Sequence, residues 1–365
     1  MRSVYYRRSA TLEEDAIKDL GKVITVNGPI DPEELGVTLM HEHLLFTCLM
    51  WFLEESHRGL GSDSYGPVTA ENAAWLREYP YRNRDNLINT DWQLTAVEVR
   101  RFKMAEGRTV VDSSSLGLGR DVWGLKKIAD DVGINIVSGT GYYVDRAHPW
   151  HVDSKSEDDL AAGMIRDISE GADGTDIRCG LIGEIGTSDP ITENEWKVLR
   201  AAAITQHATG AAIQIHALHE LKLMPDILDL LIKERGVHPT RVISGHMDLT
   251  TADHDYMKRV AEYGTFVEFD GFGHPCPTDG VYVSDTDRIG AVEWLISEGH
   301  EDQLLFSHDI GLKARLASFG GPGYDHIMTV IIPTLRKNGV ATEALTKILI
   351  DNPRRVLSID VKSLA

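Results

Sequence analysis

Short apolar segments recur along the chain, and each is followed by a stretch with helical periodicity. These segments are rich in Val, Ile, Leu or Phe and lack strict alternation of apolar and polar residues. Such a pattern is typical of strands that are buried on both faces of a parallel sheet. The segments lie at 36–40, 108–112, 134–139, 179–184, 211–216, 241–246, 265–270 and 303–309.

Helical signals separate the apolar segments. Residues 225–236 have apolar positions at i, i+3 and i+4 between an initial proline and a final glycine. The pairs Thr192/Glu195 and Ser284/Asp287 have the spacing of N-terminal capping boxes. We therefore predict helices at 90–105, 192–207, 225–236 and 284–299.

Eight predicted strands alternating with about eight helices indicate an α/β fold, a (β/α)8 TIM barrel with its site at the C-terminal ends of the strands. We expect a single domain over 1–365, with the barrel at about 22–358 and an N-terminal extension at 1–21. A doubly wound open sheet is the alternative. The connection at 44–90 is too long for a simple βα loop and is expected to cover one face of the barrel.

The composition excludes some classes of binding partner and indicates a cellular compartment. The chain has 365 residues, 37 Lys and Arg against 56 Asp and Glu, and a net charge of −19. Such acidity argues against nucleic acid or an anionic membrane as a partner. Cys48, Cys179 and Cys276 are too few and too widely spaced for a disulfide framework or a thiolate zinc finger. Without an apolar leader or a membrane-length apolar run, the protein is expected to be cytoplasmic.

One glycine motif does not predict a nucleotide site. Gly117 and Gly119 lie between a predicted strand and a helix, but Val122 occupies the third glycine position of a dinucleotide fingerprint. We interpret the segment as a plain βα turn. Phosphate-binding P-loops and the serine-hydrolase elbow have no counterpart in this sequence.

Metal-binding side chains gather where the predicted strands end. His41 and His43 are two residues apart on the first strand, so both imidazoles can face one ion. Four further strand ends contribute to the same rim of the barrel, where such enzymes keep their sites. These residues are Glu184, His216, His246 and Asp309.

The number and type of these residues indicate two metal ions. Six ligands are too many for one open catalytic zinc, but they suit two divalent ions that share a bridging carboxylate and hydroxide. Imidazole and carboxylate ligands favour Zn²⁺, with Mn²⁺ and Co²⁺ as related choices. Each residue alone also fits a structural role, such as a core histidine, a cap or a salt bridge. The joint pattern favours the metal site.

Several motifs make the sequence resemble the phosphotriesterase family of the amidohydrolase superfamily. The likeness extends from about residue 22 to the C-terminus. The matching stretches lie at 36–44, 101–103, 107–112, 117–121, 139–143, 183–188, 245–248, 307–309 and 352–355. The resemblance implies a binuclear metal centre, with His41, His43 and Asp309 at the buried ion. It implies His216 and His246 at the more exposed ion.

Two positions depart from the organophosphate-degrading members. Their bridging ligand is a carboxylated lysine, whereas Glu184 stands at that position here, which resembles the phosphotriesterase homology subgroup. Those members also carry a histidine after the seventh-strand aspartate, whereas Asp270 is followed by Gly271. We therefore expect hydrolysis of a small carboxylic ester, lactone or amide, with Asp309 as the proton acceptor for the attacking hydroxide. The alternatives are an aryldialkylphosphatase-type phosphoester hydrolase and a non-catalytic, metal-stabilised binding protein.

The substrate pocket is predicted more loosely. Tyr142 and Tyr143 follow the third strand and line the mouth or pack in the core. His274 is the histidine nearest to Asp270, and Arg288 binds an acidic substrate group or lies exposed on its helix. Trp51 covers the pocket or packs in a dimer interface. A small-molecule substrate and a homodimer are the expected partners.

Overall fold

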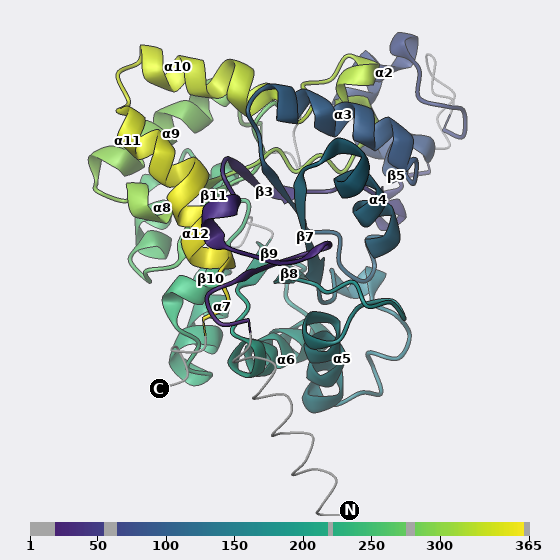
Figure 1. The fold of residues 1–365 in the computed structure, drawn as a ribbon, viewed down its shortest axis with the longest axis vertical. Helices are drawn as coiled ribbons and strands as arrows, with labels where there is room; N and C mark the ends of the chain where they lie inside the picture. Colours follow the sequence, from purple (N-terminus) through teal and green to yellow (C-terminus); the bar gives the residue numbers. More distant parts are fainter. Residues whose placement is uncertain (1–18, 55–63, 218–221, 275–281, 361–365) are drawn as a thin grey trace, which may run out of the picture.

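Parallel strands form one curved sheet at the centre of the molecule (Figure 1). The computed structural model describes residues 19–54, 64–217, 222–274 and 282–360. Among these, eight strands form the sheet in the order β3, β6, β7, β8, β9, β10, β11, β12. Their bounds are Thr38–Glu42, Thr109–Asp112, Asn135–Thr140, Leu181–Thr187, Ile213–Ala217, Val242–Ser244, Phe266–Phe269 and Leu304–Phe306.

The first and last strands meet and close the barrel. The amide of His41 donates to Ser307 Oγ at 2.8 Å, and the amide of Asp309 donates to the His41 carbonyl at 3.0 Å. The predicted (β/α)8 barrel is therefore confirmed, and the open sheet is not the architecture observed. Three predicted strand ends were wrong. β8 continues to Thr187, so Glu184 lies within the strand, whereas β10 and β12 end at Ser244 and Phe306, before His246 and Asp309.

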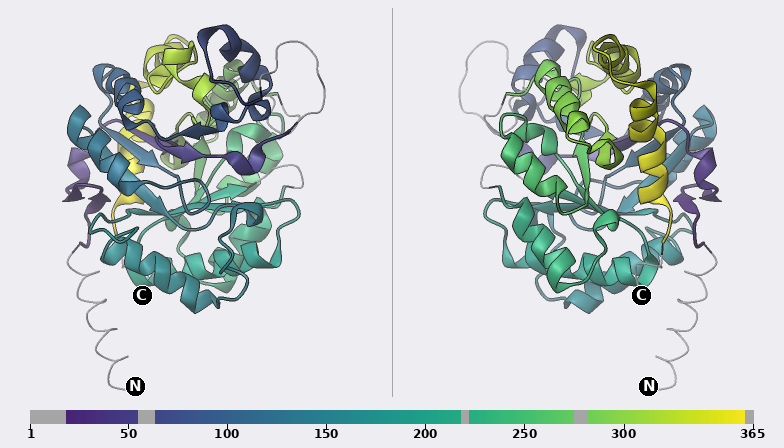
Figure 2. Two further views of the ribbon diagram at one scale, coloured as in Figure 1. Left: turned by 90° about the vertical axis from the view of Figure 1, so that its right-hand side faces the viewer. Right: turned by 90° about the vertical axis from the view of Figure 1, so that its left-hand side faces the viewer.

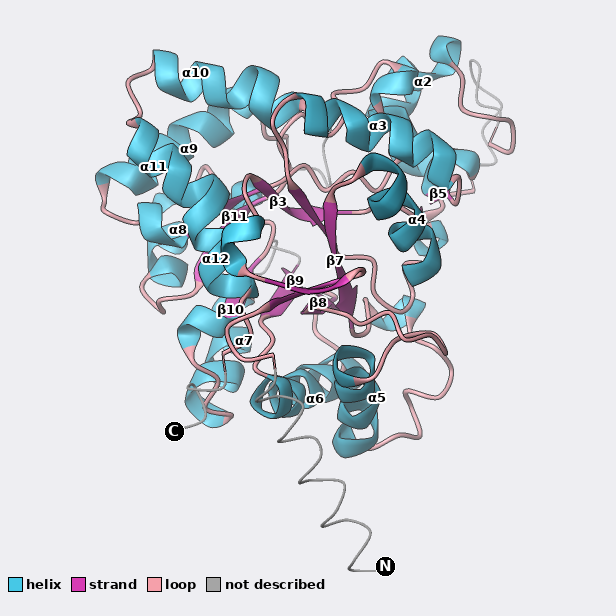
Figure 3. Ribbon diagram, viewed as in Figure 1, coloured by secondary structure: helices cyan, strands magenta, loops and turns pink. Residues whose placement is uncertain are grey.

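Helices surround the strands on the outside of the barrel (Figures 2 and 3). The helices α2 to α12 lie at Ala70–Glu78, Trp92–Met104, Val122–Val132, Glu157–Ser169, Glu193–Thr209, Met224–Leu228, His254–Ala261, Asp285–Ser297, Ile332–Lys337, Thr342–Thr346 and Asn352–Leu357. The capping boxes at Thr192 and Ser284 start α6 and α9 as predicted. The helix predicted at 225–236 is α7 followed by a π-helical segment at Asp229–Glu234. No helix in the described ranges is long and apolar enough to cross a bilayer.

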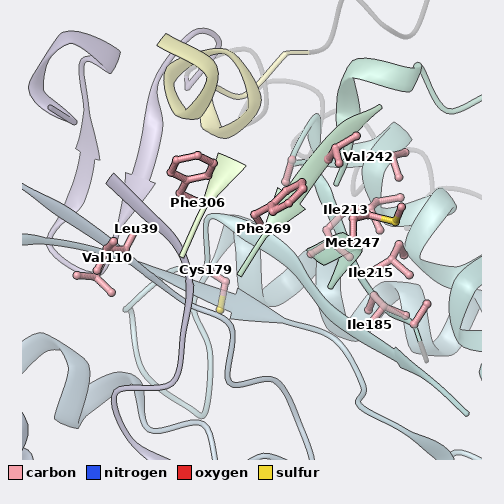
Figure 4. Close-up of a cluster of buried hydrophobic side chains, with 14 of the residues drawn as sticks. Leu39, Val110, Cys179, Ile185, Ile213, Ile215, Val242, Met247, Phe269 and Phe306 are labelled. Atoms are coloured by element: carbon pink, nitrogen blue, oxygen red, sulfur yellow. The ribbon is translucent and has the colours of Figure 1, made fainter. Parts of the chain in front are cut away.

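Alternate residues of the strands build two apolar layers. One layer fills the bottom of the barrel and includes Met40, Val111 and Leu305 from three of the strands. The other layer lies between the strands and the helices and includes Ile213 and Phe269 (Figure 4). Because both faces of each strand are buried, the strand sequences show continuous apolar runs.

A β-bulge in β3 turns the first histidine into the barrel. Leu39 pairs with Val110 and Glu42 pairs with Asp112, so β3 has one residue more than β6 between these two pairs. Regular alternation would direct His41 outward, because Met40 already faces the interior. The extra residue reverses the alternation, and the His41 side chain points inward.

A second bulge has the same effect in β8. Ile182 pairs with Ile213 and Ile185 pairs with Ile215, which again leaves one extra residue in β8. The Glu184 side chain thereby faces the interior. Gly183 precedes it at φ 148°, and a Cβ there would lie 2.8 Å from the Gln214 carbonyl oxygen. A side chain at position 183 would therefore disturb the bulge.

The long first connection packs on the loop after β12. It contains α2 and the antiparallel pair β4 (Phe46–Thr47) and β5 (Ile88–Asn89). Arg77 donates to the Ala314 carbonyl at 3.0 Å, and Lys313 pairs with Asp85 at 2.7 Å. As expected, this segment lies over the C-terminal face of the barrel. The N-terminal residues 1–18 and Cys276 fall outside the described residues.

Candidate metal centre

The barrel brings all six predicted ligands together at the C-terminal ends of the strands. Glu184 lies at the centre of the cluster. Its Oε1 is 3.2 Å from His43 Nε2, and its Oε2 is 3.0 Å from His216 Nδ1. The same Oε2 lies 3.4 Å from His41 Nε2 and 3.8 Å from His246 Nε2. One carboxylate thus contacts the histidines of both predicted ion sites.

Asp309 joins the cluster from the loop after β12. Its Oδ1 lies 3.1 Å from His43 Nε2 and 3.9 Å from His41 Nε2. Its backbone is left-handed, with φ 51°, and its side chain is 29% exposed. Among the ligand candidates this side chain is open to the pocket, which suits a group that exchanges a proton with a substrate.

Unsatisfied polar atoms test whether the residues fit a metal. His41 Nε2 and Glu184 Oε2 are buried and have no hydrogen-bond partner among the described residues. Such atoms are costly in a protein interior unless something binds them. Two groups of potential ligand atoms share Glu184, one with His41 and His43 and one with His216 and His246. Nitrogen and oxygen donors in this arrangement fit a pair of divalent ions.

Electrostatics in the cluster favour a charged bridging carboxylate. Burial disfavours the ionised form of Glu184, but His216 and His41 outweigh it and hold the pKa of this carboxyl well below its ordinary value. Burial likewise disfavours a charged His246, but Asp270 raises its pKa well above the ordinary value.

Side chains behind the histidines orient their rings. Asp270 accepts a hydrogen bond from His246 Nδ1 at 2.9 Å and lies 3.1 Å from His41 Nδ1. Glu268 also approaches His41 Nδ1, at 3.3 Å, and Ser114 Oγ is 3.0 Å from His43 Nδ1. These contacts direct each Nε2 toward the centre. Sequence reasoning missed Glu268 and Ser114, although the i, i+2 spacing of Glu268 on β11 and Asp270 directly after it could have indicated a shared face.

A pocket opens over the cluster, with about 690 Å³ of empty space including open solvent at the mouth. It is lined by His216, His246 and Asp309, and by the aromatic residue Trp51, whose ring lies near the rings of Tyr81 and Tyr143. The Tyr143 hydroxyl lies 3.3 Å from His216 Nε2. Trp51 thus covers the pocket, which is one of the two roles expected for it.

Of the other residues predicted for the pocket, two line it and one does not. His274 and Arg288 line the pocket, whereas Tyr142 packs in the apolar layer outside the barrel and does not line it. The expectation of an exposed Arg288 was wrong, because this residue is 2% exposed and pairs with Asp248. Arg315 was missed, since its distance in sequence from the strand end gave no sign that it reaches the pocket.

Comparisons with known proteins agree with this geometry. A sequence model described as "Phosphotriesterase family" matches residues 21–357. An N-acetyltaurine hydrolase of Xenopus tropicalis is 38% identical, over 93% of this chain and 98% of that protein. The structure of a resiniferatoxin-binding protein from Rhodobacter sphaeroides has a TM-score of 0.89 and 36% identity, covering 94% of this chain and 96% of that one. The lactonase Lmo2620 from Listeria monocytogenes has a TM-score of 0.76 and 26% identity, covering 93% and 99%.

Proposed function

This chain belongs to the phosphotriesterase family and is a hydrolase, and we propose that it uses two metal ions to cleave the amide bond of a small N-acyl substrate. The observation that carries the proposal is the position of Glu184 between two pairs of histidines. A glutamate in this position is suited to bridge two ions. The name of the relatives, N-acetyltaurine hydrolase, suggests N-acetyltaurine or a similar N-acyl compound as the substrate.

The contacts support one division of the ligands between the two ions. His41, His43 and Asp309 would hold one ion, and His216 and His246 would hold the other. Zinc is the metal that we propose, with manganese and cobalt as related choices. When bound, such a pair would lower the pKa of a water molecule so that it ionises near neutral pH. It would also polarise the scissile carbonyl group.

Two side chains would handle the proton and the substrate. Asp309 accepts the proton of the attacking water and returns it to the departing amine. The Tyr143 hydroxyl, next to His216, can donate to the carbonyl oxygen as negative charge develops on it. Both groups are placed by the loops that follow strands rather than by the strands themselves.

An unpaired acceptor supports an amide over a lactone. Asp248 Oδ1 is buried in the pocket lining and has no hydrogen-bond partner within the described ranges. An amide N–H can donate to it, whereas an ester or lactone offers no N–H at the scissile bond. Hydrolysis of a lactone is the second candidate, because of the similarity to the Listeria lactonase.

The test combines metal analysis with a substrate panel. We expect about two divalent ions per chain and the highest kcat/KM with N-acetyltaurine among amides, lactones and organophosphates. Preference for a lactone would favour the second candidate. A purified protein that binds no metal and hydrolyses none of these substrates would contradict the mechanism. A single domain over 1–365, a homodimer and a cytoplasmic location stay predictions.

A further inference from the structure

Arg288 is held rigidly beside the pocket. Its Nε donates to Asp248 Oδ2 at 2.6 Å, and its Nη1 donates to the carbonyls of His274 and Val283 at 3.0 and 2.9 Å. These three bonds fix the plane of the guanidinium. Its Nη2 makes no hydrogen bond among the described residues, so one edge of the guanidinium remains available for a ligand.

Gly271 leaves that edge accessible. A Cβ at this position would lie 2.6 Å from Arg288 Nη2 and 2.4 Å from Asp248 Oδ2. Gly271 itself lines the pocket. Because Gly271 has no side chain, the ion pair of Arg288 and Asp248 fits beside it, and Arg288 Nη2 lies at the pocket lining.

A second guanidinium reaches the same pocket from another loop. Arg315 ends the short 3-10 turn Lys313–Arg315 after β12, and it is 7% exposed. Its Nη1 donates to the Asp309 carbonyl at 3.2 Å. Two nearly buried guanidinium groups thus line the same pocket.

His274 adds an unpaired polar atom to the same pocket lining. Its side chain is 5% exposed, and Nε2 has no hydrogen-bond partner in the described part of the chain. Burial, together with Arg315 and Arg288, holds the pKa of His274 well below its ordinary value. The neutral imidazole can present an N–H from Nε2 without adding charge.

The carboxylates on the described pocket lining already have cationic or N–H partners. Asp248 pairs with Arg288, Asp270 accepts from His246, and Asp309 lies against His43. Asp248 engages Nε of Arg288 and leaves Nη2 without a partner among the described residues, so an incoming anion can bind at Nη2. Guanidinium groups suit the oxygens of carboxylates and related oxyanions, which they can bind through two parallel N–H bonds.

We propose that Arg288, Arg315 and His274 form an anion subsite that recognises an acidic group, a sulfonate or a carboxylate, on the N-acyl substrate. This proposal deepens the proposed function and rests on it for the bond that is cleaved. The subsite makes the enzyme selective for N-acyl compounds whose amine portion ends in an acid. Neutral amides of the same size bind without these contacts and are poor substrates.

Three probes that share an acetamide separate charge from shape. N-acetyltaurine carries a sulfonate, N-acetyl-β-alanine a carboxylate and N-acetylethanolamine a neutral hydroxyl group. We expect kcat/KM for both acids to exceed that for the neutral probe by about 100-fold or more, because charged hydrogen bonds in a buried site are strong. The ratio of sulfonate to carboxylate then shows which acid the subsite prefers. Equal kcat/KM for all three would overturn the proposal.

Variants assign the selectivity to the basic residues. Arg315→Met should lower kcat/KM for the acids, mainly through KM, about 10-fold or more beyond the change seen with the neutral probe, which reports the loss of the bond to the Asp309 carbonyl. Arg315→Lys should restore part of the loss. Because Arg288→Met also breaks the pair with Asp248, Arg288→Lys serves as the second variant. The lysine ammonium can still pair with Asp248 but has no counterpart of Nη2, so selectivity for the acids should fall.

Control and binding measurements complete the design. Arg100→Met removes one positive charge from an exposed pair between Arg100 on α3 and Asp131 on α4, and it should change neither the selectivity nor the affinity. Calorimetric binding of ethanesulfonate to the metal-loaded protein needs no hydrolysis. Weaker binding in Arg315→Met supports the subsite even if no amide is cleaved, in which case the proposed function alone fails. Unchanged binding in Arg315→Met, or an equal loss with all three probes, overturns the subsite.

Discussion

Glu42 accepts a hydrogen bond of 2.7 Å from His308 Nδ1, although the two residues are 266 positions apart in the sequence. The same carboxylate accepts the amides of His308 at 2.9 Å and Ile310 at 3.1 Å. Glu42 is the last residue of β3 and stands between His41 and His43, and the amides that it binds flank Asp309. One buried carboxylate thus sets the position of the predicted proton acceptor relative to the predicted ligands.

Replacement of Glu42 by Gln should disturb this arrangement. The amide group cannot accept from all the donors, so one buried N–H loses its partner, at a cost of about 2 kcal/mol in the free energy of unfolding. We also expect a lower kcat, because the loop that carries Asp309 is no longer held. Thermal melts and steady-state kinetics measure both, with the exposed Glu33→Gln as the control. Unchanged kcat would show that Asp309 is positioned by other contacts.

Asp309→Asn tests the proton acceptor. The amide still offers an oxygen to the metal but cannot take a proton, so we expect most of the bound metal to remain. The value of kcat should fall about 10²- to 10⁴-fold. Metal analysis with turnover of N-acetyltaurine checks both parts, and Asp302→Asn on the surface serves as the control. Near-normal turnover would mean that another group accepts the proton.

Glu184 should allow the metal centre to assemble without carbon dioxide. A glutamate needs no adduct to bridge two ions, in contrast to a carboxylated lysine. After removal of metal by a chelator, Zn²⁺ or Mn²⁺ in bicarbonate-free buffer should restore activity. Glu184→Gln should bind fewer ions per chain. A strict requirement for bicarbonate during reconstitution would contradict the role of Glu184.

His274 should make stability depend on pH. Its pKa lies at about 6.5 in the unfolded chain and well below that in the folded protein, where burial dominates. Below pH 6.5 the unfolded chain binds a proton that the folded protein does not, so the free energy of unfolding falls as pH falls, by at most about 1.4 kcal/mol per pH unit. The variant His274→Gln should show a shallower decline between pH 6.5 and 5 in denaturant melts. An equal slope would place the ionisation elsewhere.

The sequence alone determined the barrel and the residue types at its rim. Apolar runs marked the strands because both faces of each strand are buried, and the pairs Thr192/Glu195 and Ser284/Asp287 marked two helix starts through local hydrogen bonds. Parallel strands of a barrel end at one face, so side chains near those ends had to converge. These inferences depend only on neighbours along the chain and on the topology.

Tertiary structure alone decided how the side chains face one another. The bulges in β3 and β8 reverse the alternation at His41 and Glu184. Each bulge is one extra residue relative to the neighbouring strand, so it depends on how the two strands pair. The burial of Arg288 depends on Asp248 and on the missing side chain of Gly271, which lie on other elements. Periodicity describes one element at a time, whereas these contacts form only when the barrel closes and brings distant segments together.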